Sequence, residues 1–169
     1  EARNAPVRKA ERNRAMLFLM FQLGQDRYLL ETGQVEAVLP LLATKHLPGA
    51  PKGITGAINY RGRAVPVVDL ALLSLGRPAE PRLSTRIILL RYPTTPGSHD
   101  LLGLLVEQAV ETIERNAADF TASGVEAGMP AYLGPVASDE RGLIQWVRGE
   151  ALLTPEIRDI LFRQQAVEL

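Results

Sequence analysis

The stretch LPGAPKGITGAINYRGRAVPVVDL, residues 47–70, decides the fold of this 169-residue chain. Apolar residues alternate along Ile54–Tyr60, which predicts a strand. Arg61-Gly62 then makes a tight turn, and residues 64–68 return as an antiparallel strand. Because proline cannot donate a ladder hydrogen bond, Pro66 indicates an edge or a bulge there. The stretch therefore predicts a β-hairpin.

Outside this hairpin the chain predicts further short strands and two helices. Asp69 is suited to cap a short helix over residues 70–75, and Gly76 to end it with a positive φ. Thr154-Pro155-Glu156 is typical of the start of a C-terminal helix. Apolar runs predict the remaining strands, at residues 16–23, 28–30, 35–39, 86–92, 101–106, 109–113, 132–136 and 143–147, with 101–106 and 109–113 paired to each other. Many short strands with few helices favour a mainly β fold of the barrel class.

Composition and spacing exclude most enzymatic sites. The chain has no cysteine, which excludes disulfide scaffolds, Cys-ligated zinc and thiol catalysis. His46 and a loop histidine, His99, lack partners at the spacing of a catalytic triad or a metal site. Glu107, Glu111 and Glu114 alternate faces on a strand and are predicted to be solvated. We therefore expect no catalytic residue, no metal and no cofactor.

The charge pattern and hydropathy bear on possible partners. Residues 1–91 carry 14 Lys and Arg against 7 Asp and Glu, and residues 92–169 carry 5 against 12, which suggests charged surfaces for protein partners. Residues 1–14 are predicted to be a flexible basic tail, without the interleaved aromatic residues typical of nucleic-acid binding. The longest uncharged stretch, Ala127–Ser138, has 12 residues, so we expect no membrane insertion.

The central stretch resembles the signature of a known family. Its pattern LPxxPxxIxGxINxRGxxVPVVDL is similar to the core motif of the CheW-like domain, the coupling domain of bacterial chemotaxis-type signalling. Residues 18–24 with 28–30 resemble the opening hairpin of that domain, and residues 103–107 resemble a later strand. The resemblance covers roughly residues 16–162, which is nearly the whole chain.

This resemblance implies a fold, a function and a set of contact residues. The fold is two small five-stranded SH3-like β-barrels on a shared apolar core, intertwined as one CheW-like domain over residues 15–169. The function is that of a non-catalytic cytoplasmic adaptor at membrane receptor arrays. It would couple the tip of a methyl-accepting receptor, held in a groove between the barrels, to the regulatory domain of a CheA-type histidine kinase. By motif position, the partner-binding or interface-organising residues are Val35, Val38, Ile54, Gly56, Ile58, Asn59, Arg61 and Gly62. Changes there, such as Gly56→Asp, should weaken binding and leave the fold intact.

The chain departs from the family pattern in two places. Ala37 stands where the family carries a glutamate that partners the arginine of the motif, so Arg61 either pairs elsewhere, with Asp69 or Glu107, or is free for a partner. Residues 146–148, Trp-Val-Arg, replace an aspartate-containing motif. These departures, and sequence segments similar to those in adaptors of surface-sensing (Wsp-type) systems, suggest a specialised member of the family.

Two alternatives remain from the sequence. The chain is a CheW-like interaction domain excised from a larger kinase or a receiver-linked coupling protein, or it is an enzyme or small-ligand barrel that uses Glu107, Glu111 and His99. The hairpin glycines also have a purely structural interpretation, as a turn that folds well and does nothing more.

Overall fold

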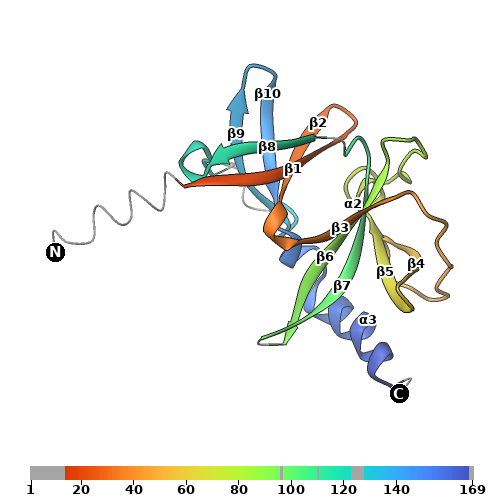
Figure 1. The fold of residues 1–169 in the computed structure, drawn as a ribbon. Coiled ribbons are helices and arrows are strands. Elements are labelled where there is room, and N and C mark those ends of the chain that lie inside the picture. The colour runs from red at the N-terminus through yellow and green to blue at the C-terminus, as the bar shows by residue number, and fades with distance from the viewer. Residues whose placement is uncertain (1–13, 96, 110, 123–127, 168–169) are drawn as a thin grey trace, which may run out of the picture.

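Ten strands in the described part of the chain form two five-stranded sheets (Figure 1). The computed structural model describes residues 14–95, 97–109, 111–122 and 128–167; most of the predicted basic tail therefore lies outside the described residues. Sheet 1 has the order β8-β1-β2-β10-β9, with β1 at Ala15–Leu23, β2 at Asp26–Glu31, β8 at Glu111–Asn116, β9 at Leu133–Asp139 and β10 at Gly142–Val147. Sheet 2 has the order β3-β6-β7-β5-β4, with β3 at Val35–Pro40, β4 at Ile54–Tyr60, β5 at Arg63–Asp69, β6 at Arg86–Thr95 and β7 at Ser98–Val106. The predicted mainly β fold is confirmed, and each sheet curls into a half-barrel.

Sheet 2 is inserted within sheet 1 in the sequence. The hairpin β1–β2 lies in sheet 1, but the next three strands, β3 to β5, belong to sheet 2. The hairpin β6–β7 lies in sheet 2, and β8 to β10 return to sheet 1. Both sheets contain one parallel pair, β2 with β10 and β7 with β5. Sheet 2 is therefore built from one continuous segment, β3 to β7, whereas sheet 1 is assembled from the strands that precede and follow that segment.

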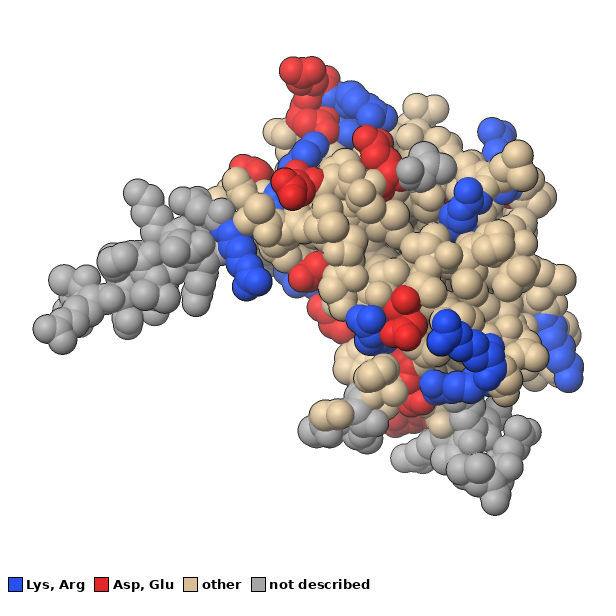
Figure 2. All heavy atoms as spheres, in the orientation of Figure 1, with Lys and Arg blue, Asp and Glu red and all other residues tan. Residues whose placement is uncertain are grey.

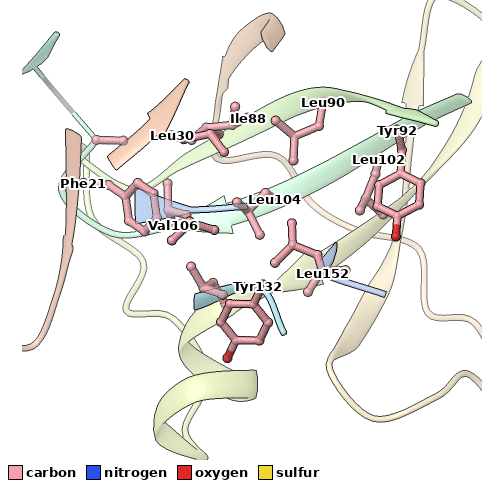
Figure 3. Close-up of a cluster of buried hydrophobic side chains, with 14 of the residues drawn as sticks. Phe21, Leu30, Ile88, Leu90, Tyr92, Leu102, Leu104, Val106, Tyr132 and Leu152 are labelled. Atoms are coloured by element: carbon pink, nitrogen blue, oxygen red, sulfur yellow. The ribbon is translucent and has the colours of Figure 1, made fainter. Parts of the chain in front are cut away.

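The largest hydrophobic cluster joins the two sheets (Figure 3). Phe21 and Leu30 of sheet 1 pack in the same cluster as Ile88, Leu90 and Leu104 of sheet 2, and all five are fully buried. Burying one such side chain contributes about 1.5–3 kcal/mol, so this shared core holds the two sheets together. Smaller clusters fill the inner face of each sheet.

The short helices position the ends of the strands. Their bounds are Thr32–Gln34 (η1), Leu70–Leu75 (α2), Ala117–Asp119 (η2), Gly149–Ala151 (η3) and Pro155–Val167 (α3). The predicted cap of α2 is confirmed, since the Leu72 N–H donates to Asp69 Oδ1 at 3.2 Å and Gly76 ends the helix at φ 72°. Thr154 caps α3 by accepting a hydrogen bond from the Ile157 N–H. Within the described ranges, none of the helices has the length and apolar character needed to cross a bilayer.

Two expectations about strand pairing are wrong. Residues 101–106 and 109–113 do not pair, because β7 stays in sheet 2 beside β6 and β5, whereas β8 begins at Glu111 and pairs with β1. Gln108, at φ 49°, lies at the turn where the chain crosses between the sheets. His99 does not lie in a loop, because the β6–β7 hairpin extends over it and pairs it with Pro93.

Candidate functional site

The eight predicted contact residues all belong to sheet 2 and lie on its two edge strands and one hairpin turn. Val35 and Val38 are on β3, four are on β4, and Arg61 and Gly62 form the turn after β4. The curl of the sheet brings its two edge strands to one hydrophobic cluster, because Ile58 of β4 is buried in that cluster and Ala37 of β3 packs against it. The interior of sheet 2 thus connects its two edges, although β3 and β4 stand at opposite ends of the strand order.

These eight residues differ in exposure. Ile58 is buried inside sheet 2, while Val35 and Ile54 pack against the shared core. Val38 is 45% exposed, and it begins an apolar surface that continues past the end of β3 through Leu41 and Leu42, which are 38% and 39% exposed. The polar members, Asn59, Arg61 and Gly62, are exposed together with Val38 and are available to a partner.

Gly56 occupies a bulge where the backbone comes close to the chain that follows β3. Its φ is 152°, and a Cβ at this position would clash with the carbonyl oxygen of Lys45. Lys45 and Ala57 exchange two backbone hydrogen bonds, of 2.8 and 2.9 Å, beside this glycine. Gly56 therefore lets this segment pair with β4. The expectation that Gly56→Asp leaves the fold intact is wrong, because any side chain meets backbone here.

The turn after β4 presents Arg61 to solvent. Asn59 Oδ1 accepts a hydrogen bond of 2.9 Å from the Gly62 N–H, and both Arg61 and Gly62 have positive φ, 49° and 83°. These are the conformations of a tight two-residue hairpin turn. The guanidinium of Arg61 lies over the ring of Tyr60, 5.2 Å from its centroid, which orients the side chain without neutralising its charge.

Arg61 has no ion pair with any described residue. Both suggested internal partners are engaged elsewhere. Asp69 accepts hydrogen bonds from the backbone of Leu72 and Ala79, and Glu107 binds Arg77. Of the alternatives that the sequence left open, the structure favours an Arg61 available to a partner.

The neighbour of Ala37 makes a different ion pair. Glu36 Oε2 lies 2.8 Å from Arg91 Nε of β6, beside a bulge in β3. Arg91 also donates to the Gly33 carbonyl at 2.9 Å. Glu36 thus ties β3 to β6 rather than reaching Arg61.

Glu107 corrects one expectation about the carboxylates. Glu111 and Glu114 are exposed as predicted, but Glu107 is 6% exposed. Its carboxylate accepts two hydrogen bonds from Arg77, at 3.0 and 3.1 Å, and one from the Glu80 N–H at 2.7 Å. The bonds from Arg77 hold the pKa of Glu107 below its ordinary value. Glu107 therefore anchors the segment after α2 to the end of β7. No group of three or more potential metal ligands occurs among the described residues.

We expect Glu107→Ala to lower the free energy of unfolding by about 2 kcal/mol, because it leaves the Glu80 N–H and the Arg77 guanidinium without their acceptor. The exposed Glu111→Ala is the matched control and should change stability little. Urea denaturation of both variants measures the difference. Equal midpoints for the two variants would show that Glu107 contributes no more than a surface carboxylate.

The sequence missed a cavity of about 590 Å³ between sheet 2, α2, the segment before β9 and the start of α3. Only Ile54 of the eight predicted residues lines it. Its other walls come from segments distant in sequence, among them Val68, Leu73, Tyr92, Tyr132, Leu153 and Arg158. In the sequence, each of these residues looks like an ordinary core or surface residue. Only the assembled fold therefore shows the cavity.

The uneven charge of the two halves of the sequence does not separate into two surfaces on the face seen in Figure 2. Acidic and basic side chains are interspersed there, with a broad uncharged area between them. The topology explains this mixing, because sheet 1 combines strands from the two ends of the sequence and sheet 2 spans the boundary between its two halves.

Comparisons with known proteins agree on one family. The model of the CheW-like domain matches residues 17–156. The chain is 24% identical over 140 residues to the chemotaxis protein CheW of Bacillus subtilis strain 168, covering 82% of this chain and 86% of that protein. Its fold is similar to the crystal structure of the scaffolding protein TtCheW from Thermoanaerobacter tengcongensis, with a TM-score of 0.69 and 23% identity over 80% of this chain and 86% of that one.

Proposed function

Because the chain belongs to the CheW-like domain family, we propose that it is a non-catalytic cytoplasmic adaptor that couples a methyl-accepting receptor to a CheA-type histidine kinase. The match of the family model to residues 17–156 carries this proposal, since it spans both sheets. The relative from Bacillus subtilis is a chemotaxis protein, which supports the same role. The insertion of sheet 2 within sheet 1, together with the core that the two sheets share, supports treating residues 15–169 as one domain.

The proposed mechanism rests on the shared core. An adaptor must hold two partners in a fixed relation, so that a small change in the receptor alters the balance between kinase states. The eight predicted residues of sheet 2 form the receptor-facing or interface-organising set, with Val38 supplying apolar contact and Arg61 a charge. The kinase regulatory domain contacts the ends of the barrels. Interdigitated side chains of the two sheets make independent movement of either one costly.

Capture from a lysate of the encoding organism tests the proposal. The tagged chain should retain both a methyl-accepting receptor and a CheA-type kinase, identified by mass spectrometry. A Gly56→Val variant, expected to lose the local fold, serves as the negative control. Retention of neither partner, or of the kinase alone, would contradict the coupling role.

We expect Arg61→Ala to weaken binding of the receptor tip or of the kinase regulatory domain roughly tenfold, because a charge-assisted hydrogen bond contributes about 1.5–3 kcal/mol. The melting temperature should stay unchanged, since Arg61 is exposed and has no ion pair with a described residue. Arg141→Ala, in the exposed turn between β9 and β10, is the matched control. Titration calorimetry with each purified partner measures the effect, and unchanged affinity for both would remove Arg61 from the site.

A further inference from the structure

The cavity between sheet 2, α2, the segment before β9 and the start of α3 is not accounted for by the proposed adaptor role, because only Ile54 of the eight predicted contact residues lines it. Its volume of about 590 Å³ lies within the range of small-molecule sites, roughly 300–1,000 Å³. Its walls come from segments that are distant in sequence, and Figure 3 shows Leu152 near Tyr132, from two of these segments. The cavity thus has the size of a ligand site and is assembled by the whole fold.

The walls of the cavity continue the shared core. Ile54, Leu73, Ala151 and Ile157 line it, and each packs against the shared core while it remains partly exposed. Removal of apolar surface from water is favourable in proportion to its area. An apolar molecule in contact with these side chains would therefore be stabilised by the same effect that stabilises the core.

The hydroxyl groups of the lining are engaged within the protein. Tyr92 donates to the Glu150 carbonyl at 2.9 Å, and the hydroxyls of Tyr132 and Ser74 lie 2.9 Å apart. Thr154 caps the N-terminus of α3. A ligand with many polar groups would have to break these contacts in order to be bound by them, so the lining favours a ligand with few polar groups.

The charged groups of the lining offset one another. Arg158 forms an ion pair with Asp159, with 3.7 Å between Nε and Oδ1. Lys52 and Glu150 are exposed and of opposite charge, and neither makes an ion pair with a described residue. An anion would meet the carboxylate of Glu150 and a cation the ammonium of Lys52. Because a charged ligand also loses its hydration on binding, the lining favours a neutral one.

We propose that this cavity binds a neutral apolar small molecule, of the class of a medium-chain alcohol, in contact with Ile54, Leu73 and Ile157. The volume of the cavity sets the size of the ligand, its walls set the apolar character, and the offset charges of its lining set the neutrality. Binding of such a molecule goes beyond the adaptor role and does not depend on it.

Displacement of N-phenyl-1-naphthylamine, a neutral dye that fluoresces in apolar surroundings, tests the proposal on the whole chain. The dye should bind the wild-type chain saturably, and 1-octanol should displace it at millimolar concentration or below. Octanoate and octylammonium, which carry the same alkyl tail with a charge of either sign, should each need at least tenfold higher concentrations. Octanol should also raise the melting temperature, as a ligand of the folded state does.

Two matched pairs of variants assign the binding to the cavity. Ile157→Gln places an amide on the cavity wall and should weaken octanol binding about tenfold. Ile160→Gln, on the same helix but 51% exposed and outside the lining, should leave octanol binding unchanged. Ala131 is exposed and lines the cavity, so Ala131→Phe should block binding without loss of the fold, whereas Ala118→Phe, exposed and outside the lining, should bind octanol normally.

The melting temperature of each variant shows whether it is folded, and Ala131→Phe keeps the test valid if Ile157→Gln is unfolded. No saturable binding to the wild-type chain, or displacement by octanoate or octylammonium as readily as by octanol, would overturn the proposal. Octanol binding that folded Ile157→Gln and Ala131→Phe both leave unchanged would also overturn it. If these variants instead weaken only binding of the receptor tip or the kinase regulatory domain, the cavity walls form a protein contact and the small-molecule site is wrong.

Discussion

Replacing Gly56 with valine is expected to lower the free energy of unfolding by about 3 kcal/mol. The backbone of Gly56 has a φ of 152°, which residues with a side chain rarely adopt, and a Cβ there would clash with the Lys45 carbonyl oxygen. That atom is fixed by the paired hydrogen bonds between Lys45 and Ala57, so it cannot move without breaking them. The variant must therefore separate this segment from β4.

Gly24→Val is the matched control for Gly56→Val. Gly24 also has a positive φ, 59°, but a Cβ there meets no atom within 4 Å. Gly24→Val carries only the cost of a left-handed conformation, about 1 kcal/mol, so the difference between the variants reports the close approach to Lys45 together with the rarer φ of Gly56. Urea denaturation gives both values. Equal destabilisation would show that the contact with Lys45 is unimportant and that φ alone accounts for the glycine.

Asp139→Asn is expected to destabilise the chain by about 3 kcal/mol, because it leaves a buried guanidinium without its charge partner. Arg27 is 7% exposed and binds both carboxylate oxygens of Asp139, at 2.8 and 2.6 Å. The pair joins β2 to the end of β9 across the parallel side of sheet 1. Trp146, whose ring centroid is 5.0 Å from that of Phe18, gives a fluorescence signal for unfolding of this sheet.

The effect of Asp139→Asn should depend on pH. The hydrogen bonds from Arg27 hold the pKa of Asp139 well below its ordinary value. The stabilisation is therefore fully present above roughly pH 4 and is lost as pH falls through the lower pKa of the folded state. The difference in the free energy of unfolding between wild type and Asp139→Asn should be constant from pH 7 to 5 and should become smaller toward pH 2. Glu140→Gln, at the adjacent exposed position, should change neither the free energy of unfolding nor its dependence on pH. If the difference between wild type and Asp139→Asn were the same at every pH, the ion pair could not be its source.

The local features of the fold were predictable from the sequence because neighbours in the chain decide them. The hairpin over residues 54–69 follows from alternating apolar residues around Arg61-Gly62, and the start of α2 follows from Asp69. The family resemblance supplied the two five-stranded barrels. Neither the local patterns nor the resemblance required knowledge of which distant segments of the chain come into contact.

What the sequence did not predict depends on long-range contact. Arg27 lies in a polar turn sequence, yet it is buried by a partner 112 residues away. Glu107 resembles Glu111 and Glu114 in pattern, but the segment after α2 folds over it and supplies Arg77. The cavity beside Arg158 exists only once the start of α3 comes close to strands β4, β5 and β6 of sheet 2. In each case the deciding atoms come from a part of the chain that no local pattern identifies.

Reconstitution of the coupled complex tests the adaptor role most directly. The measurement is kinase autophosphorylation with receptor cytoplasmic fragments and kinase at fixed concentrations, as the chain is added. We expect the chain to make kinase activity depend on the receptor, and the Arg61→Ala variant to require a higher concentration for the same effect. Arg141→Ala should match wild type. Kinase activity that is indifferent to the receptor at every concentration of a folded, kinase-bound chain would contradict the coupling role.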